Sequence, residues 1–187
     1  MLRWAAMPVV VKRQLMSAAE MDRTLRRLAH EIVEHTAQAD RLALVGIRRR
    51  GVPLAERLAR DIGGIVGHPV PVGSIDITLY RDDLSTAAPQ PVVHASDIPA
   101  VDDRDILLVD DVLYTARTIR AAINGLFDLG RPRRIRLCVL IDRGHRELPI
   151  EASFIGRVVQ TTSSEIVEVR LQEVDREERV VLIDRVP

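Results

Sequence analysis

The sequence predicts an α/β domain in which a mostly parallel sheet is flanked by helices. Three short apolar runs have the length of buried strands, and the segments between them carry apolar residues every three or four positions; the runs are Arg41–Ile47, Asp105–Asp111 and Arg134–Ile141. Buried parallel strands have this continuous apolar character, and strands that alternate with helices favour a parallel sheet. With 187 residues, the chain is long enough for one domain with a substantial core.

In the first half of the chain, an amphipathic helix is expected to begin at the N-cap Ser17, where Glu20 completes a capping box, and to run to about Thr36. The first turns of its polar face are basic. A strand over Arg41–Ile47, a basic loop and a helix follow, and the apolar face of that helix contains Leu54, Leu58 and Ile62. Val70–Tyr80 is expected to form a further strand. Residues 81–105 are polar and rich in Pro and Asp, which is typical of a lid or a disordered loop.

In the second half, the strand Asp105–Asp111 ends in two carboxylates, and a helix is expected after residues 112–116. Gly130 and Pro132 end that helix. The remaining expected strands cover residues 134–141, 154–155, 166–171 and 179–183, the last two on either side of a charged turn at residues 175–178.

Composition excludes several classes of protein. The chain is 47% hydrophobic and carries 27 basic and 27 acidic residues, so it is neither a disordered tail nor a collagen-like repeat. Because the net charge is zero, nucleic-acid binding would require a local basic patch. The single cysteine, Cys138, lies in an apolar run, so we expect a buried thiol and no disulfide within the chain. No signal peptide or membrane span is visible, and we expect a cytoplasmic protein.

The segment Ile106–Thr118 occupies a ligand-binding position, because ligands of parallel α/β sheets bind beyond the carboxyl ends of the strands. Asp110 and Asp111 are suited to accept hydrogen bonds from the two hydroxyls of a ribose. The hydroxyls of Thr115 and Thr118 and the loop amides are suited to a phosphate. Taken alone, the carboxylate pair fits a divalent-metal site or a helix N-cap equally well. The sequence contains neither a Walker A motif nor a dinucleotide-binding glycine pattern.

The run ILLVDDVLYTART over residues 106–118 resembles the phosphoribosyl pyrophosphate (PRPP) signature of type I phosphoribosyltransferases. Together with Asp142–Pro149 and Asp76–Leu84, it resembles in particular the branch of bifunctional pyrimidine operon regulators and uracil phosphoribosyltransferases. The resemblance runs from about Arg23 to the last strand. It implies the type I phosphoribosyltransferase fold in a single domain over residues 1–187, with residues 1–12 as an N-terminal extension, a flexible catalytic loop over 81–105 and a small hood.

The resemblance also implies the reaction, in which uracil and PRPP give UMP and diphosphate, with Mg²⁺ held mainly by substrate oxygens and no dedicated metal site on the protein. Asp110, Asp111 and Arg81 would be catalytic, and Tyr80 would close over PRPP together with Arg81. The other implied substrate-binding residues are the diphosphate loop Arg48, Arg49, Arg50 and Gly51, the segment Val112, Leu113, Tyr114, Thr115, Ala116, Arg117 and Thr118, and Asp142 and Arg143 near the base.

The second implied activity is binding of the leader of pyrimidine (pyr) biosynthetic mRNA, promoted by UMP and other uridine nucleotides, by a homodimer or higher homo-oligomer. The residues that match the RNA-binding positions are Arg27, His30, His145, Arg146 and Arg157. Such a surface would recognise folded RNA through phosphates, 2′-hydroxyls and unpaired bases.

Three residues depart from the family pattern. Ala116 replaces a glycine of the phosphate loop, Glu151 replaces an arginine of the RNA-binding surface, and Arg26 replaces a small polar residue. An alanine costs on the order of 1 kcal/mol if the backbone there needs a positive φ. Two alternatives follow: an RNA-binding regulator whose nucleotide site senses UMP but is catalytically weak, and a phosphoribosyltransferase for another base.

Overall fold

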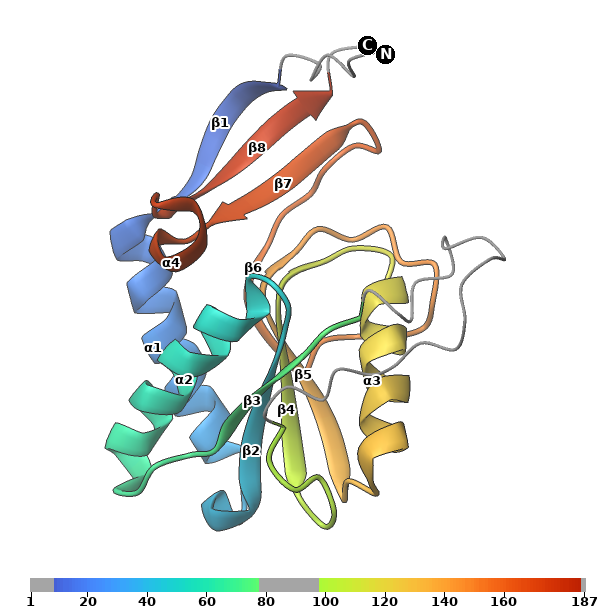
Figure 1. Ribbon diagram of the computed structural model, residues 1–187. Helices are drawn as coiled ribbons and strands as arrows, with labels where there is room; N and C mark the ends of the chain where they lie inside the picture. The colour runs from blue at the N-terminus through green and yellow to red at the C-terminus, as the bar shows by residue number, and fades with distance from the viewer. Residues whose placement is uncertain (1–8, 78–97, 186–187) are drawn as a thin grey trace, which may run out of the picture.

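The computed structural model describes residues 9–77 and 98–185 (Figure 1). Tyr80, Arg81 and most of the expected catalytic loop lie outside these residues. A five-stranded parallel sheet forms the centre, with the strand order β3-β2-β4-β5-β6. The strands are β2 (Leu42–Ile47), β3 (Val72–Ile75), β4 (Asp105–Leu113), β5 (Arg134–Asp142) and β6 (Phe154–Val158). The predicted parallel α/β architecture is therefore confirmed, although β3 is shorter than the strand expected over residues 70–80.

Helices cover both faces of this sheet. The helices α1 (Ala18–Glu34) and α2 (Gly51–Val66) lie on one face and α3 (Arg117–Leu129) on the other (Figure 1). The expected start of α1 is confirmed: Glu20 N–H donates to Ser17 Oγ, and Ser17 N–H donates to the Glu20 carboxylate at 2.8 Å. No helix in the described part of the chain is both long enough and apolar enough to cross a bilayer.

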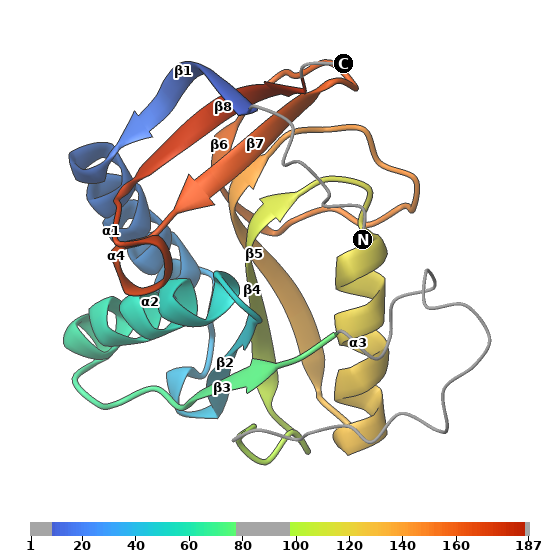
Figure 2. The ribbon, with the colours of Figure 1, turned by 45° about the horizontal axis from the view of Figure 1, so that its top comes forward.

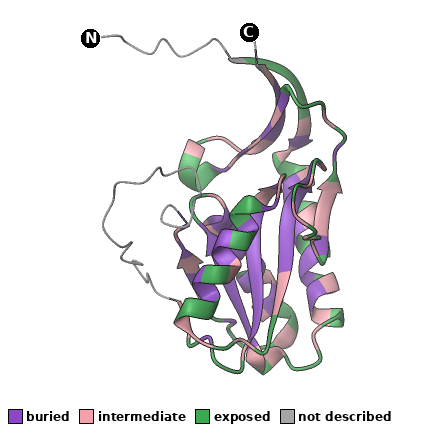
Figure 3. Cartoon of the chain, turned by 90° about the vertical axis from the view of Figure 1, so that its right-hand side faces the viewer, coloured by how far each residue is buried: buried purple, intermediate pink, exposed green. Residues whose placement is uncertain are grey.

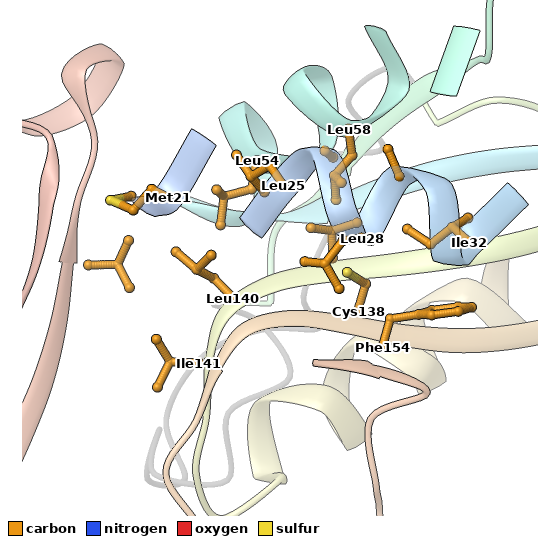
Figure 4. Packing of buried hydrophobic residues seen from close by; sticks show 14 of the residues in the cluster. Met21, Leu25, Leu28, Ile32, Leu54, Leu58, Cys138, Leu140, Ile141 and Phe154 are labelled. Carbon is orange, nitrogen blue, oxygen red and sulfur yellow. The ribbon is translucent and has the colours of Figure 1, made fainter. Parts of the chain in front are cut away.

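Alternate residues of the central strands pack on opposite faces, which gives two hydrophobic clusters. Side chains of α1 and α2 pack on one face of β2, β4 and β5, and those of α3 pack on the other. Figure 4 shows the first cluster, with Leu28 and Ile32 of α1 directed toward Cys138 and Phe154. Cys138 is buried as expected, and burial raises the pKa of its thiol to about 12. In Figure 3 the strands of the central sheet are buried over most of their length.

A second, antiparallel sheet lies beyond the carboxyl ends of the parallel strands (Figures 1 and 2). It has three strands in the order β1-β8-β7, formed by β1 (Val9–Ser17), β7 (Glu165–Arg170) and β8 (Arg179–Arg185), and the short helix α4 (Gln172–Asp175) follows β7. We call β1, β7, α4 and β8 the hood. Residues 9–12, expected to belong to an N-terminal extension, are part of β1, which pairs along β8. The sequence did not predict that this segment pairs in a sheet, because its partner β8 lies at the other end of the chain.

Candidate active site

The strand order reverses between β2 and β4. The loop after β2 leads into α2 on one face of the sheet, and the loop after β4 leads into α3 on the other face. Loops that diverge in this way leave a crevice at the carboxyl edge, where ligands of parallel α/β folds bind. The two segments selected from the sequence, residues 48–51 and 110–118, are these two loops. They are therefore neighbours in space.

Two glycines bring the start of α2 against the sheet. A Cβ at Gly51 would lie 2.3 Å from the carbonyl oxygen of Val109, and a Cβ at Gly46 would lie 2.5 Å from the carbonyl oxygen of Gly51. Only glycine permits such an approach of one backbone to another. The first turn of α2 consequently lies beside the part of β4 that carries Asp110. In the preceding loop, the peptide bond between Arg48 and Arg49 is cis, and both side chains are exposed.

Asp110 and Asp111 lie within β4, three and two residues before its end at Leu113, and not at the strand end as expected. Asp110 is buried and Asp111 is half-buried. Burial, followed by the charge of Asp111, raises the pKa of Asp110 well above its ordinary value. Burial also raises the pKa of Asp111, while the guanidinium of Arg50 opposes that shift. The site thus places two carboxyl groups side by side in a poorly solvated position, which favours ligands that supply hydroxyl donors or positive charge.

The interpretation of the pair as a helix cap is wrong. The N-cap of α3 is Ala116, whose side chain caps nothing. The carboxylates instead accept from adjacent backbone amides, Asp110 Oδ1 from Asp111 N–H and Asp111 Oδ1 from Val112 N–H, both at 2.9 Å. One oxygen of each carboxylate is used in this way, and the ribose and metal interpretations stay open.

The loop between β4 and α3 turns sharply at Ala116, which has a φ of 71° and is buried. This is the left-handed conformation in which a Cβ is unfavourable, so the departure from the family's glycine is a strained one. Thr115 Oγ1 accepts from Arg117 N–H at 3.4 Å, and the Arg117 side chain donates to Glu147 at 2.7 Å. Along the rest of the segment, Tyr114 and Thr118 are exposed, Val112 is half-buried and Leu113 is buried.

Arg50 is already paired within the protein. Its Nε and Nη2 donate to the two carboxylate oxygens of Asp175 at 3.0 and 2.8 Å. Two turns of α2 later, Arg57 donates to Glu173 and Glu178. The hood therefore contacts the loop selected for diphosphate binding. No local sequence signal indicates Asp175, because it lies 125 residues from Arg50.

Asp142 and Arg143, selected as residues near the base, are buried and bonded internally. Asp142 accepts from Gly144 N–H at 2.9 Å and from the Arg146 guanidinium. The Arg143 side chain donates to the carbonyl oxygen of Glu165 at 2.6 Å and lies 4.1 Å from the centre of the Tyr114 ring. Arg143 therefore fastens the segment between β6 and β7, which leads into the hood, to the end of β5.

The residues selected for RNA binding fall into two groups. Arg27 and Arg157 come from α1 and β6, which pack together, and His30 lies one helical turn beyond Arg27. Arg27 donates to the carbonyl oxygens of Ile155 and Gly156 in β6. His145 and Arg146 instead follow β5 at the carboxyl edge, where His145 bonds to the carbonyl oxygen of Thr161. Of the two residues that depart from the family pattern here, Glu151 lies 3.7 Å from Arg146 and Arg26 pairs with Asp22 at 3.0 Å.

Within the described residues, no three His, Cys, Asp or Glu side chains gather as a metal-binding group. The carboxylate pair Asp110–Asp111 supplies oxygen donors, which are the ligands that Mg²⁺ prefers, and Mg²⁺ commonly takes one or two carboxylates together with substrate phosphates. The donor set at this site therefore fits a magnesium ion that arrives with a phosphorylated substrate.

Comparison with known proteins agrees with this geometry. Residues 13–184 match the phosphoribosyl transferase domain. The bifunctional protein PyrR of Pelotomaculum thermopropionicum is 58% identical over 92% of this chain and 96% of its own length. The PyrR protein of Thermus thermophilus is 57% identical over 93% of this chain and 97% of its own length. The PyrR protein of Deinococcus radiodurans is 51% identical over 92% of this chain and 95% of its own length.

The structure also resembles purine phosphoribosyltransferases. A hypoxanthine phosphoribosyltransferase of Staphylococcus aureus superposes with a TM-score of 0.71 at 16% identity, covering 93% of this chain and 92% of that one. The Trypanosoma cruzi hypoxanthine phosphoribosyltransferase superposes with a TM-score of 0.71 at 18% identity, covering 94% of this chain and 92% of that one. At this identity the likeness shows the fold alone. The relatives of high identity and the matching domain show more: the chain belongs to the phosphoribosyltransferase family and, within it, to the bifunctional PyrR proteins.

Proposed function

We propose that this protein is a uracil phosphoribosyltransferase, converting uracil and PRPP to UMP and diphosphate, and a UMP-responsive regulator that binds pyr mRNA. One observation carries the enzymatic part: the Asp110–Asp111 pair and the arginine loop 48–51 meet at the point where the strand order reverses. A ribose bearing phosphate on one side and diphosphate on the other matches this combination of acceptors and cations. The high identity to PyrR proteins over nearly the whole chain supports the choice of uracil.

In the proposed mechanism, Asp110 and Asp111 accept hydrogen bonds from the ribose hydroxyls through the oxygens that the backbone leaves open. The amides and hydroxyls of residues 112–118 surround the 5-phosphate at the N-terminus of α3, where backbone N–H groups favour an anion. Arg48, Arg49 and Arg50, with the backbone at Gly51, offset the charge of the departing diphosphate. A Mg²⁺ ion bound with PRPP would be held mainly by substrate oxygens, near the Asp110–Asp111 pair, and would supply further charge neutralisation.

Positive charge develops on the ribose as the bond to diphosphate breaks, so the two carboxylates stabilise that ring only when they are ionised. Because their pKa values are raised, activity is expected to fall at a higher pH than for ordinary aspartates as the solution becomes acidic. Near the base, the side chains of Asp142 and Arg143 are bonded internally, so the backbone around them is the proposed contact. Tyr80 and Arg81 are proposed to close over PRPP and exclude water.

The decisive experiment is a Mg²⁺-dependent assay of PRPP with uracil, run beside hypoxanthine and orotate, with the nucleotide as readout. Turnover with uracil and little with the other bases is the expected result. Turnover with another base would select a different phosphoribosyltransferase. UMP binding without turnover would select the nucleotide-gated regulator. The variant Asp111→Asn is expected to weaken PRPP use and to keep the fold, because it removes an acceptor and no core volume.

For the regulatory activity, Arg27, His30, His145, Arg146 and Arg157 are the proposed RNA-binding residues. Binding would weaken as the salt concentration rises, because basic residues that contact RNA phosphates release bound counterions and the charge of a local patch is screened. Binding of folded pyr leader RNA, measured with and without UMP, tests this part. RNA affinity that is the same with and without UMP would contradict the proposed regulatory activity.

The protein is proposed to act as a single domain that assembles as a homodimer or higher homo-oligomer in the cytoplasm. The family match over residues 13–184 supports one domain, and the one cysteine, buried and unpaired, suits a reducing compartment. Light scattering of the purified protein with and without UMP tests the assembly.

A further inference from the structure

The hood meets α2 through two arginines. Arg57 bridges Glu173 of α4 and Glu178, which follows α4, with N–O distances of 2.6 Å to each. Arg50, at the N-cap of α2, pairs with Asp175 at the end of α4. The two bridges differ in position. Arg57 lies inside α2, whereas Arg50 belongs to the loop proposed to bind diphosphate.

The Asp175 carboxylate bonds both to Arg50 and to the backbone at the start of its own helix. Its Oδ2 accepts from Leu171 N–H at 3.0 Å as well as from Arg50 Nε at 3.0 Å. The carboxylate therefore has a fixed orientation relative to α4, and its two oxygens face two nitrogens of the guanidinium. A planar guanidinium bound in this bidentate way keeps its plane and direction.

One nitrogen of the Arg50 guanidinium, Nη1, is not bonded to Asp175. Nη1 makes no hydrogen bond to another residue in the described part of the chain, and the side chain is 29% exposed. Its charge acts on Asp111, whose pKa it lowers against the effect of burial. Arg50 thus lies between the hood and the carboxylate pair. The Arg48 side chain, by comparison, is exposed, and among the described residues its guanidinium bonds to Ser74 Oγ alone, at 3.4 Å.

We propose that Asp175 is a positioning residue for the diphosphate group of PRPP and acts by holding Arg50 in place. The inference rests on the proposed function and adds to it a residue from the hood. An arginine loses up to about 2 kcal/mol of side-chain entropy when it is immobilised. Because Asp175 immobilises Arg50 before the substrate arrives, that cost is met during folding and not during binding.

A competing role for Asp175 predicts the opposite result. A carboxylate that merely neutralises Arg50 would have to be displaced by diphosphate, and its removal would then tighten PRPP binding. The sign of the change on substitution therefore decides between positioning and competition.

The test compares Asp175→Asn with the matched control Glu173→Gln, which weakens a bridge of the same short helix without touching Arg50. We expect Asp175→Asn to raise the KM for PRPP about tenfold, equivalent to 1.4 kcal/mol, with little change in kcat or in the KM for uracil. Asp175→Glu should recover part of the loss, and Glu173→Gln should leave all three constants near those of the parent. An unchanged or lower KM for PRPP would overturn the proposal. So would an equal loss in kcat and both KM values, which would indicate a structural role.

Calorimetric titration with magnesium diphosphate, in the absence of base, separates this inference from the choice of base. Diphosphate affinity reduced about tenfold in Asp175→Asn, with UMP affinity and Tm near those of the parent, supports the positioning role even if uracil is not the substrate. Equal diphosphate affinity in the two proteins overturns it. A parent protein that binds neither diphosphate nor UMP would refute the proposed function, and the inference with it.

Discussion

Replacing Asp110 by asparagine is expected to stabilise the fold at neutral pH while it impairs catalysis. Burial and the charge of Asp111 raise the pKa of Asp110 well above the value it has in an unfolded chain. A raised folded-state pKa contributes stability that is fully present below the unfolded value and is lost as pH rises through the folded value. Above the unfolded pKa, therefore, the buried carboxyl of Asp110 makes the native state less stable than an uncharged residue of the same shape would. Asparagine resembles the protonated carboxyl: its Oδ1 can still accept from Asp111 N–H, and its amide group can donate to the Asp111 carboxylate.

The expected size follows from linkage. Each unit by which the folded pKa exceeds the unfolded one costs about 1.4 kcal/mol at pH values above both. We expect Asp110→Asn to gain at least about 1 kcal/mol at pH 8, which is about 2–4 °C in Tm for a chain of this size. The gain should shrink as pH falls from the raised pKa toward the ordinary aspartate range. Loss of a charged acceptor for a ribose hydroxyl should lower kcat/KM for PRPP about ten- to a hundredfold.

Asp105 is a matched control in the same strand with the opposite sign. It is buried, but the bidentate partner Arg133, at 3.1 and 2.8 Å, lowers its pKa. The stability it contributes is present above the unfolded pKa and is lost as pH falls. Asp105→Asn should therefore cost about 1.5–3 kcal/mol at pH 8 and progressively less in acid.

Thermal unfolding of parent, Asp110→Asn and Asp105→Asn between pH 4 and 8 measures both effects in the absence of substrate. Opposite Tm changes at pH 8, each shrinking toward acid, are expected. If Asp110→Asn lowers Tm at pH 8, or if its effect is independent of pH, the reasoning about the carboxylate pair is refuted.

Three further predictions concern other parts of the chain. Ala116→Gly should change stability by less than about 1 kcal/mol, because relief of the positive φ is offset by a lost buried methyl group worth about 0.8 kcal/mol. Ala116→Val should cost more than about 2 kcal/mol in the same unfolding assay. A valine variant as stable as the parent would contradict the strained conformation. Cys138 should resist iodoacetamide at pH 8 in the native protein and react once per chain in denaturant, because its thiol pKa is about 12; rapid native labelling would contradict its burial. His30→Glu should weaken UMP-dependent RNA binding, measured by filter binding, and leave Tm and turnover unchanged. Arg27→Ala should weaken RNA binding and also lower Tm, because Arg27 donates to two β6 carbonyl oxygens. Unchanged RNA affinity in both variants would show that this face of α1 is not part of the RNA interface.

Much of the central parallel sheet and its helices could be predicted because their signals are local. Apolar runs of strand length mark β2, β4 and β5, and the Ser17–Glu20 capping box marks the start of α1. The segment from Asp110 to Thr118 carries the carboxylates and the phosphate loop on consecutive residues, so its place at a strand-to-helix junction needed no long-range information. The error at this segment was the helix-cap interpretation, since β4 continues to Leu113 and α3 begins only at Arg117.

The sequence by itself therefore determined the alternation of strands and helices, the buried cysteine and the residue types of the ligand loops, because periodicity and capping act over a few residues. Only the tertiary structure decided that residues 9–17 join the hood, since β1 pairs with the far end of the chain. It also decided which charged side chains are committed to internal partners: Arg50 to Asp175, Arg146 to Asp142 and Arg27 to β6. A charge has a partner only where the fold brings one within hydrogen-bond distance, and that distance is a property of the whole packed chain.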